Sequence, residues 1–142
     1  MSAVPIHAAT SSDAIRLELE EVLKLQRAAY FAHPYPTFAE RKADLLKLKA
    51  FIKDNRDAIV DAISADYGNR SRHETLFAEI FSVVDGVEHT LKHLKTWMKP
   101  QRRGVDIKNF FGAKHRVVPQ PLGIVGAIVP WTFPINLSFS GL

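Results

Sequence analysis

The stretch Gly123-Ile-Val-Gly-Ala-Ile-Val-Pro-Trp-Thr-Phe-Pro134 decides the fold, and it lies within residues 122–142, a run without a single charged residue. Its β-branched side chains predict a buried strand over residues 124–129. Pro130 and Pro134 then interrupt the chain, which predicts a tight loop with aromatic walls directly after the strand. Ligands of open α/β sheets bind at such strand ends. We therefore expect an α/β fold with a binding site at this loop.

The composition is that of an ordinary globular domain, with 142 residues of which 46% are hydrophobic and 24% are charged. The net charge of +4 comes without a block of five or six basic residues, so we expect no nucleic-acid partner. The chain has no cysteine, which excludes disulfides and thiolate metal sites and fits a cytoplasmic protein. Residues 122–142 could span a bilayer by length, but Pro130 and Pro134 would break that helix, and we expect no membrane segment.

Residues 11–100 are expected to form a helical region, after a disordered tail over residues 1–10. Ser11, Ser12 and Asp13 are N-cap candidates for a first helix, which should end near His33 and Pro34. The two apolar sets that follow predict two more helices with inward-facing residues: Leu45, Leu48, Phe51 and Ile52, then Ile59, Val60 and Ile63.

Local signals predict where these later helices begin and end. Thr37 and Glu40 form a capping box before the second helix, and Asn55 interrupts the chain after it. Gly68 is a natural residue to end the third helix, because glycine tolerates a positive φ. Ser71 and Glu74 form a second capping-box candidate, so a fourth helix should open there.

The fourth helix is predicted to be the longest, and its apolar residues recur at steps of three and four: Leu76, Ile80, Val83, Val87, Leu91, Leu94 and Met98. Its charged residues Glu79, Asp85 and Glu88 are expected on the surface. His89 and His93 have the spacing of a zinc-ligand pair, but no glutamate lies between them and no third ligand is evident. We expect these histidines on a solvated face and no metal site.

A β-hairpin is predicted within residues 101–120, with strands over 105–111 and 114–118 joined at Gly112-Ala113. The apolar strand over residues 124–129 would need neighbours on both edges, which one short hairpin does not provide. We therefore expect the other strands to lie in sequence outside these 142 residues, and the chain to be a fragment of a larger protein.

Two features of the apolar stretch concern ligands directly. Gly123 and Gly126 lie inside the predicted strand rather than after it, so they form no phosphate-binding turn and more plainly serve close packing. In the loop, the hydroxyl of Thr132 could donate a hydrogen bond to a ligand. The alternative is a buried turn in which Trp131 fills the core, and composition alone leaves both interpretations open.

At this point the sequence resembles a known family. Residues 121–134 are similar to the first nucleotide-domain strand and following loop of NAD(P)-dependent aldehyde dehydrogenases. Asp66-Tyr-Gly-Asn-Arg-Ser-Arg-His-Glu-Thr75 and Trp97-Met-Lys-Pro100 resemble the class-3-type branch, nearest to coniferyl aldehyde dehydrogenases. The similarity covers nearly the whole chain, from about the first helix onward.

This resemblance implies a truncated version of that fold: a helical N-terminal region, residues 101–120 as the hairpin of an oligomerisation arm, and residues 121–142 as the start of a Rossmann-like nucleotide-binding domain. It implies a likely homodimer only through the family, a small-molecule aldehyde as substrate, and its oxidation to an acid with NAD or NADP. The implied cofactor-binding residues are Ile128, Val129, Pro130 and Trp131.

Two departures from the family bear on catalysis. Thr132 stands where the family usually has an asparagine that stabilises the oxyanion, and the loss of one such donor typically costs about 10²–10³ in rate. The family reaction proceeds through a cysteine thiolate, and these 142 residues contain no cysteine. We therefore expect the chain alone to be inactive towards aldehydes.

Two other classes of function stay open. The chain could be a non-catalytic helical interaction module, in which case it should be monodisperse and melt cooperatively by itself. It could also be a basic helix bundle that binds nucleic acid, in which case binding should weaken steeply with salt.

Overall fold

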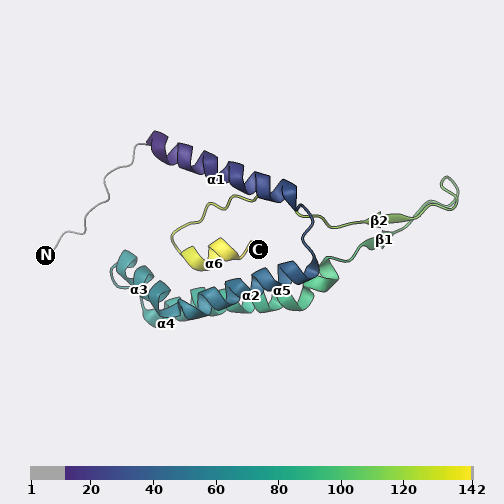
Figure 1. Ribbon diagram of the computed structural model, residues 1–142. Coiled ribbons are helices and arrows are strands. Elements are labelled where there is room, and N and C mark those ends of the chain that lie inside the picture. The colour runs from purple at the N-terminus through teal and green to yellow at the C-terminus, as the bar shows by residue number, and fades with distance from the viewer. Residues whose placement is uncertain (1–11, 142) are drawn as a thin grey trace. The chain divides into compact units, whose positions relative to one another are not determined.

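The computed structural model describes residues 12–141 and is mostly helical, with one small two-stranded sheet (Figure 1). The elements are α1 (Ser12–Ala32), α2 (Phe38–Asp54), α3 (Arg56–Tyr67), α4 (Arg72–Thr75), the π-helical turn η1 (Leu76–Phe81), α5 (Ser82–Trp97), β1 (Gln101–Arg103), β2 (His115–Val117) and α6 (Pro134–Phe139). They divide between two compact units. The first combines the chain up to Tyr35 with Pro121–Val125, and the second combines Pro36–Gln120 with the chain from Gly126 onward. The tail predicted for residues 1–10 lies outside the described residues.

The first unit is built from α1 and a short extended segment. The hydroxyl of Tyr30 donates to the carbonyl oxygen of Pro121 across 3.4 Å. Gly123 has a φ of +99°, and a Cβ at that position would lie 3.7 Å from the ring of Tyr30. The positive φ requires glycine here, so Gly123 serves the close approach of the two segments that the sequence indicated.

The predicted boundaries of α2 and α3 are confirmed. The backbone N–H of Thr37 donates to Glu40 Oε2 across 2.6 Å, and the Glu40 N–H donates to Thr37 Oγ1 across 3.3 Å, which completes the capping box. Asn55 follows α2, and Gly68 ends α3 with a φ of +79°. These signals are local in the chain, and they act as their sequence predicts.

The long helix runs through α4, η1 and α5, and its start differs from the prediction in one respect. A helix does begin after Ser71, but the Ser71 side chain makes no capping hydrogen bond. The carboxylate of Glu74 lies 3.5 Å from Arg70 Nη2 instead of reaching back to Ser71. The second capping box is therefore wrong, because a nearby cation competes for its glutamate.

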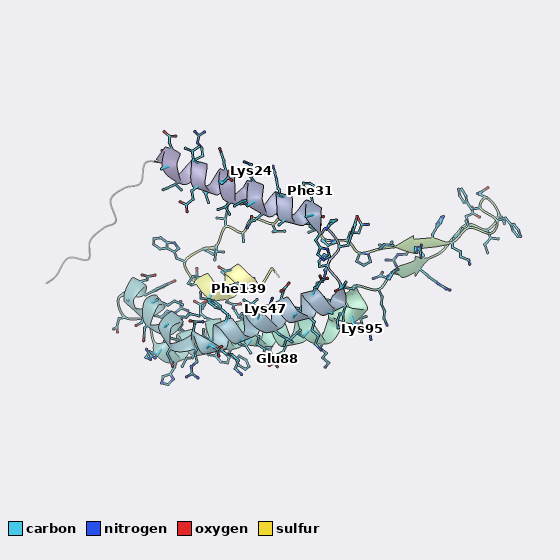
Figure 2. The ribbon with its side chains drawn as sticks, in the orientation of Figure 1. Lys24, Phe31, Lys47, Glu88, Lys95 and Phe139 are labelled. Atoms are coloured by element: carbon cyan, nitrogen blue, oxygen red, sulfur yellow. The ribbon has the colours of Figure 1, made fainter. Side chains whose placement is uncertain are left out.

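The core of the second unit lies where α2 and α3 pack against the long helix. Its buried cluster consists of Ile52, Val60, Ile80, Val83 and Val87. Leu45 and Leu48 pack against it, as predicted, and so does Phe139 from α6 (Figure 2). Phe51 was predicted to face inward but is 56% exposed.

The hairpin differs from the prediction in the position of its first strand. Gln101 pairs with Val117 and Arg103 with His115, so β1 lies before residue 105. Residues 105–111 do not form a strand, because Asp106 folds them into a turn. Its carboxylate accepts hydrogen bonds from the Lys108 N–H at 3.0 Å and from the Asn109 side chain at 2.6 Å.

The buried strand predicted over residues 124–129 is not formed in the described part of the chain. These residues are extended, and Val125 and Ile128 are 71% and 103% exposed. An apolar strand is stable when neighbouring strands satisfy its backbone groups, and the two described strands pair only with each other.

Candidate functional site

The residues predicted to bind the cofactor form a continuous apolar surface. Ile128 and Trp131 are 103% and 87% exposed, Pro130 is exposed and Val129 is half-buried. The interpretation of Trp131 as a core residue is therefore excluded for this chain. Together with Pro134, Asp66 and Tyr67, Trp131 lines a hollow of about 530 Å³.

Thr132 follows this surface and sits on a backbone that is held from behind. Its side chain is exposed, and its carbonyl oxygen accepts a hydrogen bond of 2.9 Å from Arg70 Nη1. Two residues later Pro134 occupies the first turn of α6, where a missing N–H costs nothing. The hydroxyl of Thr132 is thus presented at the junction between the apolar surface and α6.

Glu79 is the anchor for α6. Its side chain is completely buried, and Oε2 accepts hydrogen bonds of 2.9 Å from the backbone N–H groups of both Ile135 and Asn136. The side-chain amide of Asn136 returns a 2.9 Å bond to the carbonyl oxygen of Ala78. A carboxylate at these first-turn amides satisfies donors that the helix itself leaves unpaired.

Arg70 balances the charge of Glu79. Its Nη1 lies 3.4 Å from Glu79 Oε1, and its side chain is only 5% exposed. The guanidinium lies 5.0 Å from the ring centres of both Tyr67 and Phe133, a contact suited to a planar, delocalised cation. Among the described residues, Arg70 Nε and Nη2 find no hydrogen-bond acceptor, so the pair is held mainly through Nη1 and the two rings.

Glu79 is the functional residue that the sequence reasoning placed wrongly, since it was expected on the surface. Asp85 and Glu88 are exposed as expected. The missing signal was position: Glu79 lies three residues after Leu76 and four before Val83, inside the apolar stripe of the long helix. A charged residue in such a stripe indicates a buried partner, and here the partner is Arg70.

The other candidate groups do not form a site. His89 and His93 stack on each other with ring centres 4.2 Å apart, and His93 stacks on Trp97. Over residues 12–141, no cluster of three or more histidine, aspartate or glutamate side chains could hold a metal ion. Within the same range, no helix combines the length and apolarity needed to cross a membrane.

The comparisons with known proteins agree with the resemblance seen in the sequence. The model of the aldehyde dehydrogenase family matches residues 5–142. A probable coniferyl aldehyde dehydrogenase of Pseudomonas aeruginosa is 42% identical over 88% of this chain and 26% of its own length. A coniferyl aldehyde dehydrogenase of a Pseudomonas species is 38% identical over 88% of this chain and 25% of its own length. Mouse aldehyde dehydrogenase family 3 member B2 is 32% identical over 68% of this chain and 20% of its own length.

These matches share one property: the chain spans about a quarter of the length of the curated relatives it resembles. The match to the family nevertheless covers almost all of this chain, including the apolar surface, Thr132 and the buried pair behind them. The chain belongs to the aldehyde dehydrogenase family.

Proposed function

We propose that this chain is the N-terminal part of an NAD(P)-dependent aldehyde dehydrogenase that oxidises an aldehyde to its carboxylic acid. The observation that carries the proposal is the family match over residues 5–142, which includes the loop 130–134. Relatives named as coniferyl aldehyde dehydrogenases, at 42% and 38% identity, support coniferyl aldehyde or another aromatic aldehyde as the substrate.

The residues that would hold the cofactor are Ile128, Val129, Pro130 and Trp131, as one wall of its cleft. They fit the nicotinamide half of NAD or NADP because they are uncharged and largely exposed in an extended segment. A flat apolar wall suits an aromatic ring and keeps water from one side of it. When bound, the cofactor supplies the acceptor for the hydride that leaves the substrate.

Thr132 is proposed as a donor to the substrate oxygen on which negative charge develops. Its exposed side chain follows the cofactor wall directly, and its own carbonyl oxygen is held by Arg70. A fixed hydroxyl costs little reorganisation when the charge forms. The family resemblance supports this role, because the position is that of the oxyanion-binding asparagine.

Other parts of the reaction are proposed to come from outside these residues. The nucleophilic thiolate cannot come from a chain without cysteine, so the chain alone should not turn over an aldehyde. In the complete protein, residues 124–129 would pair with further strands as the first strand of a Rossmann-like domain. The hairpin β1–β2 would serve as the oligomerisation arm of a homodimer, and a cysteine-free chain fits the cytoplasm.

The test is to express the complete gene product that contains these residues and to assay it with coniferyl aldehyde and either NAD⁺ or NADP⁺. We expect reduced nicotinamide to accumulate, and none with the 142-residue chain alone. Thr132→Ala should lower kcat by about 10²–10³, whereas Ser140→Ala, at an exposed hydroxyl bonded locally to Leu137, should not. A complete product that oxidises no aldehyde, or turnover by the chain alone, would overturn the proposal.

A further inference from the structure

The segment 132–136 is held by side chains that come from far away in the sequence. Arg70 reaches Thr132, Glu79 reaches Ile135 and Asn136, and the Asn136 side chain reaches Ala78. In the described part of the chain, no strand pairing supports the residues just before this segment. Its conformation therefore depends on these few contacts.

Arg70 fixes the first end of the segment. A hydrogen bond of 2.9 Å to the Thr132 carbonyl oxygen sets the plane of the peptide that follows Thr132. The ring of Phe133, on that same peptide, lies against the guanidinium at 5.0 Å. With the peptide plane fixed, rotation about the Thr132 backbone is restricted, and so is the direction in which its side chain leaves the chain.

Glu79 fixes the second end. One of its oxygens accepts from Ile135 and Asn136, and the other lies 3.4 Å from the same Arg70 nitrogen that bonds Thr132. A single buried ion pair therefore joins both ends of the segment. Since Glu79 is fully buried and the Arg70 side chain is 5% exposed, solvent does not compete for these contacts.

We propose that Arg70 and Glu79 are positioning residues that fix the segment 132–136 and thereby aim the Thr132 hydroxyl at the reacting carbonyl. The inference deepens the proposed function and rests on it for the kinetic consequence. Neither residue touches substrate or cofactor in this proposal; both act through the backbone of the segment.

The first experiment measures the segment itself, by hydrogen–deuterium exchange of the complete gene product. Arg70→Lys keeps the charge, but one ammonium cannot lie flat between two rings while it donates to Thr132 and Glu79. We expect exchange in a peptide covering residues 132–139 to accelerate about tenfold or more, with peptides of α2 and α5 unchanged. The matched control is Arg72→Lys, since Arg72 is 51% exposed and pairs with the exposed Asp61.

The second experiment is a double-mutant cycle in kcat. A misplacement near 1 Å can cost about 10²-fold in rate, so Arg70→Lys should lower kcat by about 10- to 10²-fold. The KM for the aldehyde should change by less than about twofold, because the donor acts on the charge that develops in the transition state. In a Thr132→Ala background, Arg70→Lys should lower kcat by less than about twofold, because its effect passes through Thr132.

The outcomes separate the two proposals. Local acceleration of exchange without any aldehyde oxidation would keep the clamp on the segment but refute the aim at a reacting carbonyl, together with the proposed function. Oxidation with equal kcat losses in both backgrounds would refute the positioning role and leave the proposed function intact. Uniform acceleration across α2 and α5 would show a purely structural role and refute it as well.

Discussion

Removing the charges of Arg70 and Glu79 singly should destabilise the second unit more than removing them together. The pair is almost completely buried, with side chains 5% and 0% exposed. Breaking such a pair from one side leaves the other charge uncompensated, and typically costs about 3–5 kcal/mol. Because a domain is stable by only about 5–15 kcal/mol, Glu79→Leu alone should remove a third or more of that stability.

The structure also says how large the coupling should be. Arg70→Met with Glu79→Leu leaves no buried charge, although the amides of Ile135 and Asn136 and the Thr132 carbonyl still lose their partners. We therefore expect the double variant to cost about 1–3 kcal/mol less than the sum of the single variants.

The assay is urea unfolding of the four proteins, followed by far-ultraviolet circular dichroism. The control cycle removes Lys49 and Glu88, a pair at 2.7 Å whose side chains are 26% and 55% exposed, and it should show no measurable coupling. If the Arg70 and Glu79 substitutions add to within about 0.5 kcal/mol, the charges do not depend on each other and the reasoning is wrong.

Three further predictions use other parts of the second unit. Ile52→Ala, in the fully buried core, should cost about 2–5 kcal/mol in urea unfolding, whereas the exposed neighbour Phe51→Ala should stay within about 0.5 kcal/mol. Gly68→Ala should destabilise by about 1–2 kcal/mol in the same assay, because its φ of +79° disfavours a Cβ. The hydrogen bond from Lys49 lowers the pKa of Glu88. This contribution to stability is present above the unfolded pKa and is lost as the pH falls through the folded one, so an NMR titration of Lys49→Met should show the Glu88 midpoint rise.

The parts of the fold that the sequence predicts are those with causes inside a few residues. The Thr37 and Glu40 cap and the glycine that ends α3 act within one helical turn, and both form as expected. The pair at Ser71 and Glu74 has the same pattern and fails. Arg70 competes for that glutamate, and the pattern does not record which other charges lie nearby.

The strand and the site fail or succeed for a different reason, which is distance along the chain. A strand over residues 124–129 needs hydrogen-bond partners from other strands, and the described residues offer none, so its apolar composition alone does not form it. The sequence does identify the loop at Thr132. It does not reveal that Arg70, 62 residues earlier, holds that loop.

Glu79 shows what joins these two levels. Its place in an apolar stripe is a local fact, readable from the sequence, whereas its partners Arg70, Ile135 and Asn136 are brought to it only by the packing of α6 on the long helix. A buried carboxylate is costly unless its hydrogen bonds are satisfied. The N–H groups at the start of α6 satisfy it, and the carboxylate in turn holds α6 in place. The stability of the helical core and the geometry of the proposed catalytic loop thus depend on the same side chain, which is why a single charge in the stripe indicates more about function than any exposed charge on this chain.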